Sequence, residues 1–266
     1  MTLVLAIVNQ KGGVGKTTTA VNLAASLAAQ EKRVLVVDLD PQGNATSGLG
    51  ISRDQGERPN VYHALLGESD VRAAVLPTEV PHLFLLPAGT DLVGAELELV
   101  GMENREFRLR TALEPLRAEH DYILIDCAPS LGLLTINALV AADRVLVPLQ
   151  CEYYALEGLS SLLRTIDLVH QGLNTALVLD GVLLTMFDAR NNLARQVAKD
   201  VQKTLGDKVY ATVIPRNVRL SEAPSHGRPV ILYDIESKGA QSYLQLADEL
   251  LRRHAGANEP KKAARR

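Results

Sequence analysis

Residues 10–18 read Gln-Lys-Gly-Gly-Val-Gly-Lys-Thr-Thr, a run of glycines, lysines and hydroxyls that suits the binding of phosphate groups. An apolar segment at 3–8 precedes these residues, and a stretch rich in Ala and Leu at 17–30 follows them. This order predicts a strand, a phosphate-binding loop and a helix. Backbone N–H groups of the loop and the helix N-terminus would favour an anion there. We expect the cradle for the phosphates to consist of Gly12, Gly13, Val14 and Gly15.

Two lysines and two threonines accompany these glycines. Lys16 is predicted to reach the β- and γ-phosphates, the Thr17 hydroxyl to bind Mg²⁺, and Thr18 to complete the nucleotide contacts. The usual pattern starts with a glycine where this chain has Gln10, and Lys11 stands directly before the glycine pair. Lys11 is therefore one lysine more than the loop needs. From the residues alone it could serve a neighbouring subunit, act within its own subunit, or face solvent.

Three aspartates follow apolar runs and could bind a metal ion or activate water. Asp126 comes directly after the run at 122–125, and Asp38 and Asp40 follow the run at 33–37. In a parallel sheet, ligands bind beyond the carboxyl ends of the strands. We expect Asp126 to hold Mg²⁺ through a water, with a plain strand-end aspartate as the alternative. Asp38 is assigned to the Mg²⁺ shell, with a helix or turn cap as its alternative, and Asp40 to the attacking water; spacing alone does not choose between the two.

The elements that must position these residues alternate between strands and helices. This alternation predicts an α/β domain: a mostly parallel, twisted sheet of about seven or eight strands with helices on both faces. We expect one domain over 1–255, a mobile loop at 51–60, and a basic, disordered tail at 256–266. The expected strands are 3–8, 33–37, 83–87, 122–125, 144–149, 178–184 and 209–214, and the expected helices are 17–30, 91–118, 132–141, 155–171, 192–205 and 239–253.

Composition excludes several classes of protein. A chain of 266 residues with 47% hydrophobic residues can bury a large core, and aliphatic side chains must fill it because aromatics make up only 4%. Two cysteines are too few for a disulfide framework or a CxxC metal site, and Cys127 is expected to be a small buried residue. No targeting segment or apolar run of 18 residues occurs. We expect a soluble cytoplasmic protein without a membrane partner.

Two further regions could bind ligands. Pro215, Arg216 and Asn217 follow the apolar run at 209–214: Asn217 can both donate to and accept from a purine edge, and Pro215 offers an apolar wall. A plain turn, with Asn217 bonding its own backbone, is the alternative. Residues 190–228 hold eight basic and three acidic side chains, which indicates either a phosphate-binding surface or a solvated helix face.

Five stretches together resemble a known family. The loop KGGVGKTT at 11–18 resembles the deviant Walker A loop of the ParA/MinD group of P-loop ATPases. The chain as a whole, over about residues 3–254, is similar to the ParA/Soj subgroup, the partition ATPases of chromosomes and plasmids. The other four stretches are VDLDPQGNATSGLG (37–50), YILIDCAPSLGLLTINAL (122–139), QCEYYALEGL (150–159) and TVIPRNVRLSEAPSHGRPV (212–230).

The resemblance implies an ATPase with ATP and Mg²⁺ as cofactors. It implies that Lys11 crosses to the other subunit's nucleotide in a homodimer, that Lys16 and Asp40 complete the catalytic set, and that Asp40 orients the attacking water. The segment Pro215–Asn217 would contact the base, and Glu152 is a candidate for contact with the nucleotide or the partner subunit. Arg190 and Arg219 match positions used for nonspecific double-stranded DNA.

The resemblance also implies a ParB-like partner that stimulates hydrolysis, and association with the nucleoid. Two rival classes share the P-loop. A membrane-cycling regulator of the MinD type needs an apolar C-terminal anchor, which 256–266 lacks. An iron protein needs cysteines placed to bridge a cluster, and Cys127 and Cys151 lack the glycine-rich surroundings of such a site.

Overall fold

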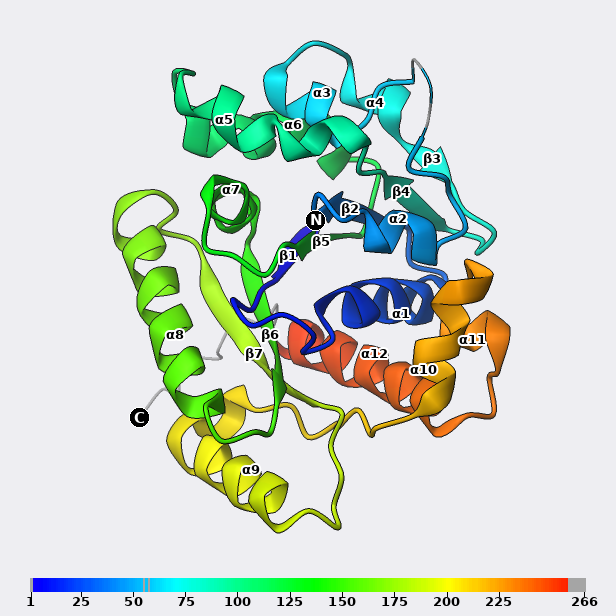
Figure 1. Cartoon of the computed structure of the whole chain (residues 1–266), viewed down its shortest axis with the longest axis vertical. Helices are drawn as coiled ribbons and strands as arrows, with labels where there is room; N and C mark the ends of the chain where they lie inside the picture. The colour runs from blue at the N-terminus through cyan, green and yellow to red at the C-terminus, as the bar shows by residue number, and fades with distance from the viewer. Residues whose placement is uncertain (1, 55, 57, 258–266) are drawn as a thin grey trace, which may run out of the picture.

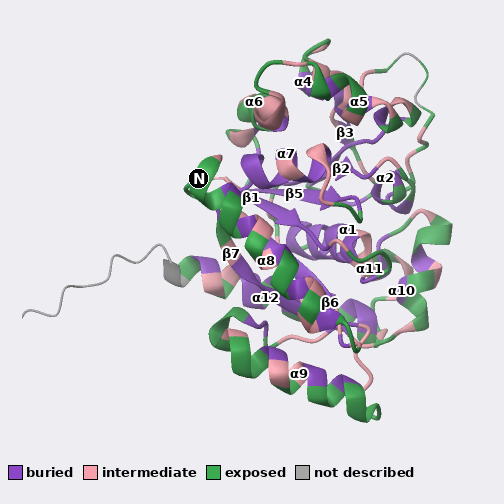
Figure 2. Ribbon diagram, turned by 60° about the vertical axis from the view of Figure 1, so that its left-hand side comes forward, coloured by how far each residue is buried: buried purple, intermediate pink, exposed green. Residues whose placement is uncertain are grey.

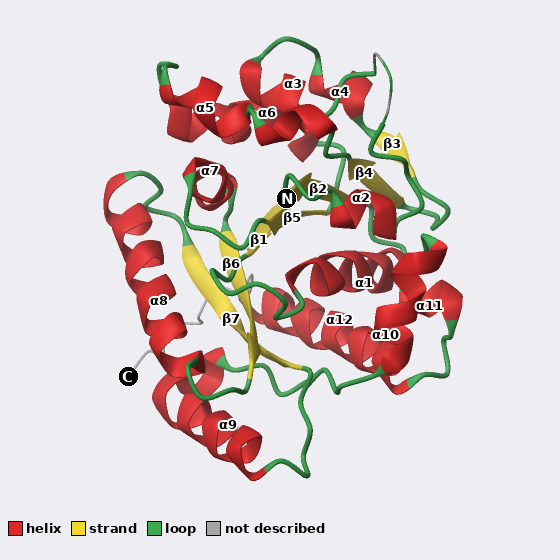
Figure 3. Cartoon of the chain, viewed as in Figure 1, coloured by secondary structure: helices red, strands yellow, loops and turns green. Residues whose placement is uncertain are grey.

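The computed structural model describes residues 2–54, 56 and 58–257. A seven-stranded sheet runs through this part of the chain in the order β3-β4-β2-β5-β1-β6-β7. Every neighbouring pair is parallel except β3 and β4. Figure 3 shows the strands in yellow between the helices. The strands are β1 (Leu3–Ile7), β2 (Val34–Leu39), β3 (Leu76–Pro77), β4 (Leu83–Leu86), β5 (Tyr122–Cys127), β6 (Arg144–Gln150) and β7 (Val178–Thr185).

Helices cover both faces of this sheet, as the alternating pattern predicts (Figure 1). The α-helices are α1 (Lys16–Ala28), α2 (Asn44–Gly48), α3 (Val61–Leu66), α4 (Val71–Ala74), α5 (Ala95–Val100), α6 (Arg108–Arg117), α7 (Leu133–Ala141), α8 (Ala155–Gly172), α9 (Asn192–Leu205), α10 (Val218–Glu222), α11 (Val230–Tyr233) and α12 (Lys238–Ala257). Short 3₁₀ helices occur at Thr90–Val93, Arg105–Phe107, Gly206–Lys208 and Ala223–His226.

Two apolar cores lie on the two faces of the sheet. Leu5 and Ile7 of β1 pack with α1 and α12, whereas Val4 and Ala6 of the same strand pack with the core of α3 to α9. Strands buried on both faces explain why the sequence shows continuous apolar runs rather than alternation. In Figure 2 the central strands are accordingly buried along their length. The two cores hold the strands in place, so the carboxyl ends of β1, β2 and β5 form one fixed edge.

The predicted strand at 209–214 is wrong. This segment makes only isolated bridges, from Val209 to Val182 of β7 and from Pro215 to Phe187 just beyond it. The Glu249 carboxylate of α12 accepts the N–H groups of Ala211 (2.9 Å) and Thr212 (2.8 Å), so a side chain takes the donors that a continuous ladder would use. The segment is therefore attached to α12 as well as to the sheet.

The predicted single helix at 91–118 is also wrong, because the chain breaks there into short pieces. A 3₁₀ turn, α5, a second 3₁₀ turn and α6 occupy this range. Gly94 and Gly101 flank α5, and Asn104 adopts a left-handed backbone (φ +52°) that no helix continues. The helices at 17–30, 132–141, 155–171, 192–205 and 239–253 are confirmed within a few residues.

Residues 51–54, 56 and 58–60 contain no helix or strand, which agrees with the predicted loop; its predicted mobility stays a prediction. The expected tail at 256–266 lies outside the described residues from 258 onward. None of the described helices combines the length and hydropathy that a bilayer crossing requires.

Candidate nucleotide-binding site

The phosphate-binding loop leaves β1 and enters α1 at the carboxyl edge of the sheet. Gly13 (φ +73°) and Gly15 (φ +90°) adopt left-handed backbone conformations, which a residue with a Cβ rarely takes. Gly15 directly precedes α1, so the helix N-terminus opens onto the loop. The predicted order of strand, loop and helix is thus present, with the backbone donors where an anion would be bound.

Buried side chains fix this loop to neighbouring strands. Asn9 donates to the Pro148 carbonyl on β6 (2.8 Å) and accepts from the Lys11 N–H (3.0 Å). Thr185, at the end of β7, donates to the Val14 carbonyl (2.8 Å). These contacts come from β6 and β7, so the loop is held in shape before any nucleotide binds.

Lys16 points into the cradle. Its ammonium donates to the Lys11 carbonyl (3.1 Å), which curls the side chain over the loop. Burial lowers the pKa of Lys16, while the charges of Asp126 and Asp40 oppose that change. A buried ammonium next to two carboxylates suits the neutralisation of phosphate charge, as predicted for Lys16.

Asp126 and Asp38 lie side by side, because their strands pair in register. Within the described part of the chain, neither oxygen of the Asp126 carboxylate has a hydrogen-bond partner, although both are buried. Burial and the neighbouring Asp38 charge raise the pKa of Asp126 well above its usual value, and the nearby Thr17 hydroxyl only partly opposes this. A buried carboxylate without donors is the environment that a cation would complete.

The residues present therefore fit Mg²⁺ bound by few protein ligands. The described residues contain no cluster of three or more acidic, His or Cys side chains arranged to bind a metal by themselves. Mg²⁺ in nucleotide sites typically uses one or two protein ligands, with phosphate oxygens and waters completing the octahedron. Asp126 and the Thr17 hydroxyl are placed for that role.

Asp38 makes a different set of contacts. One carboxylate oxygen accepts from the Thr46 N–H (2.7 Å) and hydroxyl (2.6 Å), and the other from the Asp40 N–H (3.3 Å). Burial raises its pKa to about 6 despite these donors. The hydrogen bonds favour the alternative role, in which Asp38 holds the turn that leads into α2. Its place in the Mg²⁺ shell stays a prediction.

Asp40 is buried at the start of that turn. Its Oδ1 accepts from the Gln42 N–H (2.9 Å), and no protein donor reaches its Oδ2 among the described residues. The turn directs Asp40 to the same edge as the phosphate-binding loop. Its carboxylate is close enough to Lys16 for its charge to oppose the lowering of the Lys16 pKa. An oxygen without a protein donor is available to orient a water.

The predicted base-binding segment borders the same site. A cavity of about 250 Å³ is lined by Gly15, Thr18, Met186, Pro215, Arg216 and Asn217, together with parts of α10 and α12. The phosphate-binding loop and the predicted base-contacting residues therefore share one hollow. Asn217 Oδ1 accepts from the Arg219 N–H (3.0 Å) and caps α10. The predicted alternative, a turn in which Asn217 bonds the backbone, therefore holds for this oxygen. The side-chain N–H₂ group can still donate to a base.

Met186 is a lining residue that sequence reasoning missed. It adopts a left-handed backbone (φ +47°) between Thr185 and Phe187, a conformation that is costly for a residue with a long side chain. No pattern in the sequence marks this position. Its thioether side chain suits contact with an aromatic base.

The second lysine, Lys11, lies outside the cradle. Its side chain is 45% exposed and forms an ion pair with Glu152, just after β6. Nothing in the spacing of the sequence predicts this pair, because 141 residues separate the two. Lys11 therefore does not serve the phosphate cradle of its own subunit in this conformation.

The two arginines predicted to bind DNA are exposed and ion-paired. Arg190, in the loop after β7, pairs with Asp188 (2.9 Å). Arg219, in α10, pairs with Glu222 (2.8 Å) and Asp234 (3.0 Å). Exposed pairs of this kind are weak, so a phosphate can displace the carboxylates. Their role in DNA binding stays a prediction.

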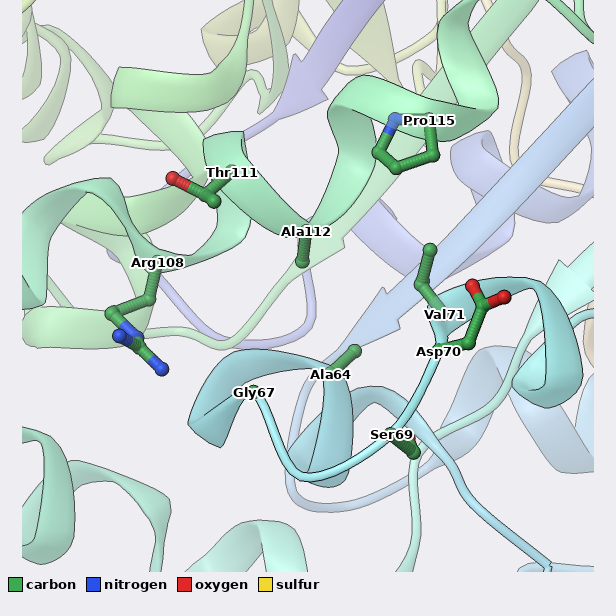
Figure 4. A pocket seen from close by; sticks show the side chains of 9 residues that line it. All are labelled: Ala64, Gly67, Ser69, Asp70, Val71, Arg108, Thr111, Ala112 and Pro115. Atoms are coloured by element: carbon green, nitrogen blue, oxygen red, sulfur yellow. The ribbon is translucent and has the colours of Figure 1, made fainter.

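Other groups do not form a site. Cys127 is buried, and burial raises the pKa of its thiol well above its usual value, so it is a packing residue as predicted. Figure 4 shows a separate cavity of about 240 Å³ between α3, α4 and α6. Arg108 closes one end of it by donating to the carbonyls of Leu65 (2.8 Å) and Leu66 (2.6 Å). No predicted site residue lines this cavity, so it belongs to the helix junction.

Comparisons with known proteins agree with this site. An AAA domain family model matches residues 2–179. The chain is 60% identical to chromosome partitioning protein ParA of Myxococcus xanthus (strain DK1622), covering 99% of this chain and 91% of that protein. It is 61% identical to sporulation initiation inhibitor protein Soj of Bacillus subtilis (strain 168), covering 93% and 97%.

Two solved structures are similar over nearly the whole chain. One, titled cobyrinic acid a,c-diamide synthase from Mycobacterium smegmatis with bound ADP and magnesium, is 43% identical with a TM-score of 0.85 and covers 97% of each chain. The other, the cell division ATPase MinD of Pyrococcus furiosus, is 26% identical with a TM-score of 0.79 and covers 95% of this chain and 99% of that one. Together with the phosphate-binding loop and the unpaired Asp126, these relatives show that the chain belongs to the ParA/Soj family of P-loop ATPases.

Proposed function

We propose that this chain is a DNA-partitioning ATPase that works in the cytoplasm on the nucleoid. Two ATP-bound copies form a two-fold dimer, the dimer binds double-stranded DNA without sequence preference, and hydrolysis stimulated by a ParB-like partner releases it. This cycle would drive chromosome or plasmid segregation.

One observation carries the proposal: the two lysines of the loop lie in different places. Lys16 is buried in the cradle, whereas Lys11 is half-exposed and paired with Glu152. Lys16 satisfies the charge requirement of its own subunit. An exposed lysine beside the phosphates can then act on a nucleotide held by a second copy, as an arginine finger does in trans.

Phosphoryl transfer needs mainly positioning and charge neutralisation. Lys16 would neutralise the phosphates, and Asp40 would orient the attacking water and accept part of its proton. When bound, Mg²⁺ would neutralise the remaining phosphate charge from its place beside Asp126 and Thr17. Because the Lys11 that acts on a nucleotide would come from the second copy, a single copy should hydrolyse ATP slowly.

The family relatives favour partition over other activities. Relatives at 60% and 61% identity are named for chromosome partitioning and sporulation control, whereas the structure titled as a diamide synthase is 43% identical. Arg190 and Arg219 support a DNA contact because both follow elements that end at the nucleotide edge, so a dimer brings four such arginines together. If one copy neutralised roughly four phosphates and two copies roughly eight, the salt slope would change from about −3.6 to about −7.

The test is DNA binding with ATP, with ADP and without nucleotide. We expect binding only with ATP for the unaltered chain, loss of binding for Lys11→Ala, and persistent binding for Asp40→Ala because its loaded dimer cannot reset. Arg190→Ala should weaken binding and lower the salt slope, whereas Arg164→Ala, an exposed arginine on α8, should not. Equal binding with and without ATP would contradict the proposal.

A further inference from the structure

The exposed aromatic side chains of this chain lie at one place. All ten aromatic residues, seven Tyr and three Phe, fall within the described part, and only Tyr153 and Tyr154 are exposed, at 72% and 69%. Their rings contact each other edge to face, with centroids 4.9 Å apart. Two adjacent tyrosines outside any core are costly to leave in water. They mark a surface that something else covers.

This tyrosine pair is continuous with the nucleotide edge. It occupies the turn between β6 and α8, directly after Glu152, the partner of Lys11. The Gln10 side chain donates to the Gly158 carbonyl in the first turn of α8 (3.2 Å), so the phosphate-binding loop and this turn are joined at two points. The loop before α1 follows β1 and α8 follows β6, so both leave the carboxyl ends of two neighbouring strands.

The turn itself has a defined shape. Glu152 N–H donates to the Gln150 carbonyl (2.9 Å), and Ala155 N–H donates to the Glu152 carbonyl (3.0 Å). Ala155 is buried under the helix, while the two tyrosines project from the turn. Tyrosines on a fixed turn lose little conformational freedom when they are covered, which is the property of interface anchors.

We propose that Tyr153 and Tyr154 anchor the interface between two nucleotide-loaded copies of this chain. The inference rests on the proposed dimer and names the residues that hold it together. A two-fold interface places the same patch on both copies, so the patch must complement itself. Two tyrosines beside one lysine and one glutamate meet that condition, since a patch without net charge does not repel its own copy.

The charges argue against DNA as the occupant of this patch. A polyanion needs an excess of positive charge, whereas Lys11 and Glu152 cancel each other. The expected DNA residues lie elsewhere, Arg190 in the loop after β7 and Arg219 in α10. A second copy also explains why the aromatic pair adjoins the very lysine that is proposed to cross.

The first experiment measures dimerisation by analytical ultracentrifugation with ATP, in an Asp40→Ala background that blocks hydrolysis. Hot-spot aromatic residues cost 2 kcal/mol or more on truncation, so we expect the Tyr153→Ala/Tyr154→Ala variant to dimerise at least about 30-fold more weakly. Tyr153→Phe/Tyr154→Phe should keep most of the affinity. The matched control is Leu168→Ala, an exposed apolar residue of α8, which should leave dimerisation unchanged.

A nucleotide-affinity measurement on the monomer separates interface from folding effects. ATP binding at concentrations below dimerisation should be the same for the Ala variant and the background. If the background itself stays monomeric with ATP, the proposed function fails. If the background dimerises and the Ala variant dimerises equally tightly, the function stands and only this inference is overturned.

A second experiment needs no substitution in the patch. Hydroxyl-radical oxidation read by mass spectrometry should label Tyr153 and Tyr154 strongly without nucleotide and at least several-fold less with ATP in the Asp40→Ala protein. Unchanged labelling in a sample that is dimeric would place the interface elsewhere. Protection only after a ParB-like protein is added would assign the patch to that partner and overturn the proposal.

Discussion

At the scale of single residues, the site depends on charges that are left incomplete. Asp126 is a buried carboxylate to which no described residue donates, and Lys11 is a lysine whose partner is a glutamate distant in the sequence. The arrangement of Asp126 costs free energy in the isolated chain and a bound cation would relieve it. The exposed pair of Lys11 with Glu152 is weak, so Lys11 can exchange this partner for another anion at little cost. Strain of this kind is typical of functional sites.

Asp126→Asn should show separately how much the buried carboxylate destabilises the fold and how much it contributes to Mg²⁺ binding. Burial raises the pKa of Asp126 above its unfolded value of 3.8, so its ionised form destabilises the fold at neutral pH. The Asn variant should therefore keep or raise the Tm of the nucleotide-free protein. It should lose most of the extra stabilisation that Mg²⁺ gives to the nucleotide-bound protein.

Thermal unfolding with ATP, with and without Mg²⁺, measures both effects, and the arm without Mg²⁺ is the control. An Asn variant that loses stability without nucleotide and still responds fully to Mg²⁺ would show that Asp126 is structural.

At the scale of elements, the segment 209–215 decides how the base pocket is held. A strand would fix it to the sheet alone, but here Glu249 on α12 accepts two of its backbone N–H groups while two others still donate to β7. The same carboxylate also accepts from Arg253 (2.7 Å). Pro215 and Asn217 therefore depend on a helix near the C-terminus for their position.

Glu249→Gln should loosen this segment while keeping its shape. Hydrogen bonds to charged groups contribute about 1.5–3 kcal/mol and the amide keeps part of them, so we expect a loss of about 1–2 kcal/mol in the free energy of unfolding. Nucleotide affinity should fall in parallel, because the Pro215–Asn217 wall is less ordered.

Chemical denaturation and nucleotide titration measure the two effects of that change. Asp248→Asn, which removes an exposed carboxylate charge on the same helix, is the matched control and should change stability by less than about 0.5 kcal/mol. Full nucleotide affinity in a destabilised Glu249→Gln protein would show that the pocket does not depend on α12.

Much of the architecture could be predicted from the sequence because continuous apolar runs mark strands buried on both faces. Six of the seven predicted strand ranges are strands, and the P-loop context placed Lys16 and Asp126 at one edge. The prediction of a strand at 209–214 failed because two of its N–H groups donate to Glu249, a residue that no local pattern connects to it. The pairing of Lys11 with Glu152 and the backbone of Met186 were likewise out of reach, since both arise from tertiary packing.

At the scale of the whole molecule, α12 is fastened to the sheet by a buried charge network. Asp180 on β7 accepts from the His254 ring (2.8 Å) and the Tyr210 hydroxyl, and pairs with Arg144 (3.4 Å). Burial opposes the charge of Asp180, but the hydrogen bonds from His254 and Tyr210 outweigh it and lower its pKa. The last long helix is thus tied to β6 and β7 at the edge opposite the nucleotide.

Asp180→Asn should destabilise the protein by about 2–4 kcal/mol at neutral pH, because breaking a buried charge pair leaves its partners uncompensated. A lowered folded pKa means that the stabilisation is present above the unfolded value of 3.8 and is lost as the pH falls through the folded pKa. The gap between the Asn variant and the unaltered protein should therefore narrow below about pH 4.

Denaturant unfolding at several pH values tests this, with Asp207→Asn, an exposed aspartate after α9, as a control for nonspecific charge effects. A gap that stays constant down to pH 3 would assign the effect to packing rather than to the carboxylate charge.

The two edge strands of the sheet decide whether copies of this chain can pair strand to strand. On one margin β3 is only Leu76–Pro77, and proline offers no N–H for a further strand. On the other, β7 is covered by the 209–215 segment, of which Glu249 accepts the Ala211 and Thr212 N–H groups. Open strand margins are templates for irreversible aggregation, and here both are capped. Many copies held close together on one surface would then not pair through their sheets. Their association would stay reversible.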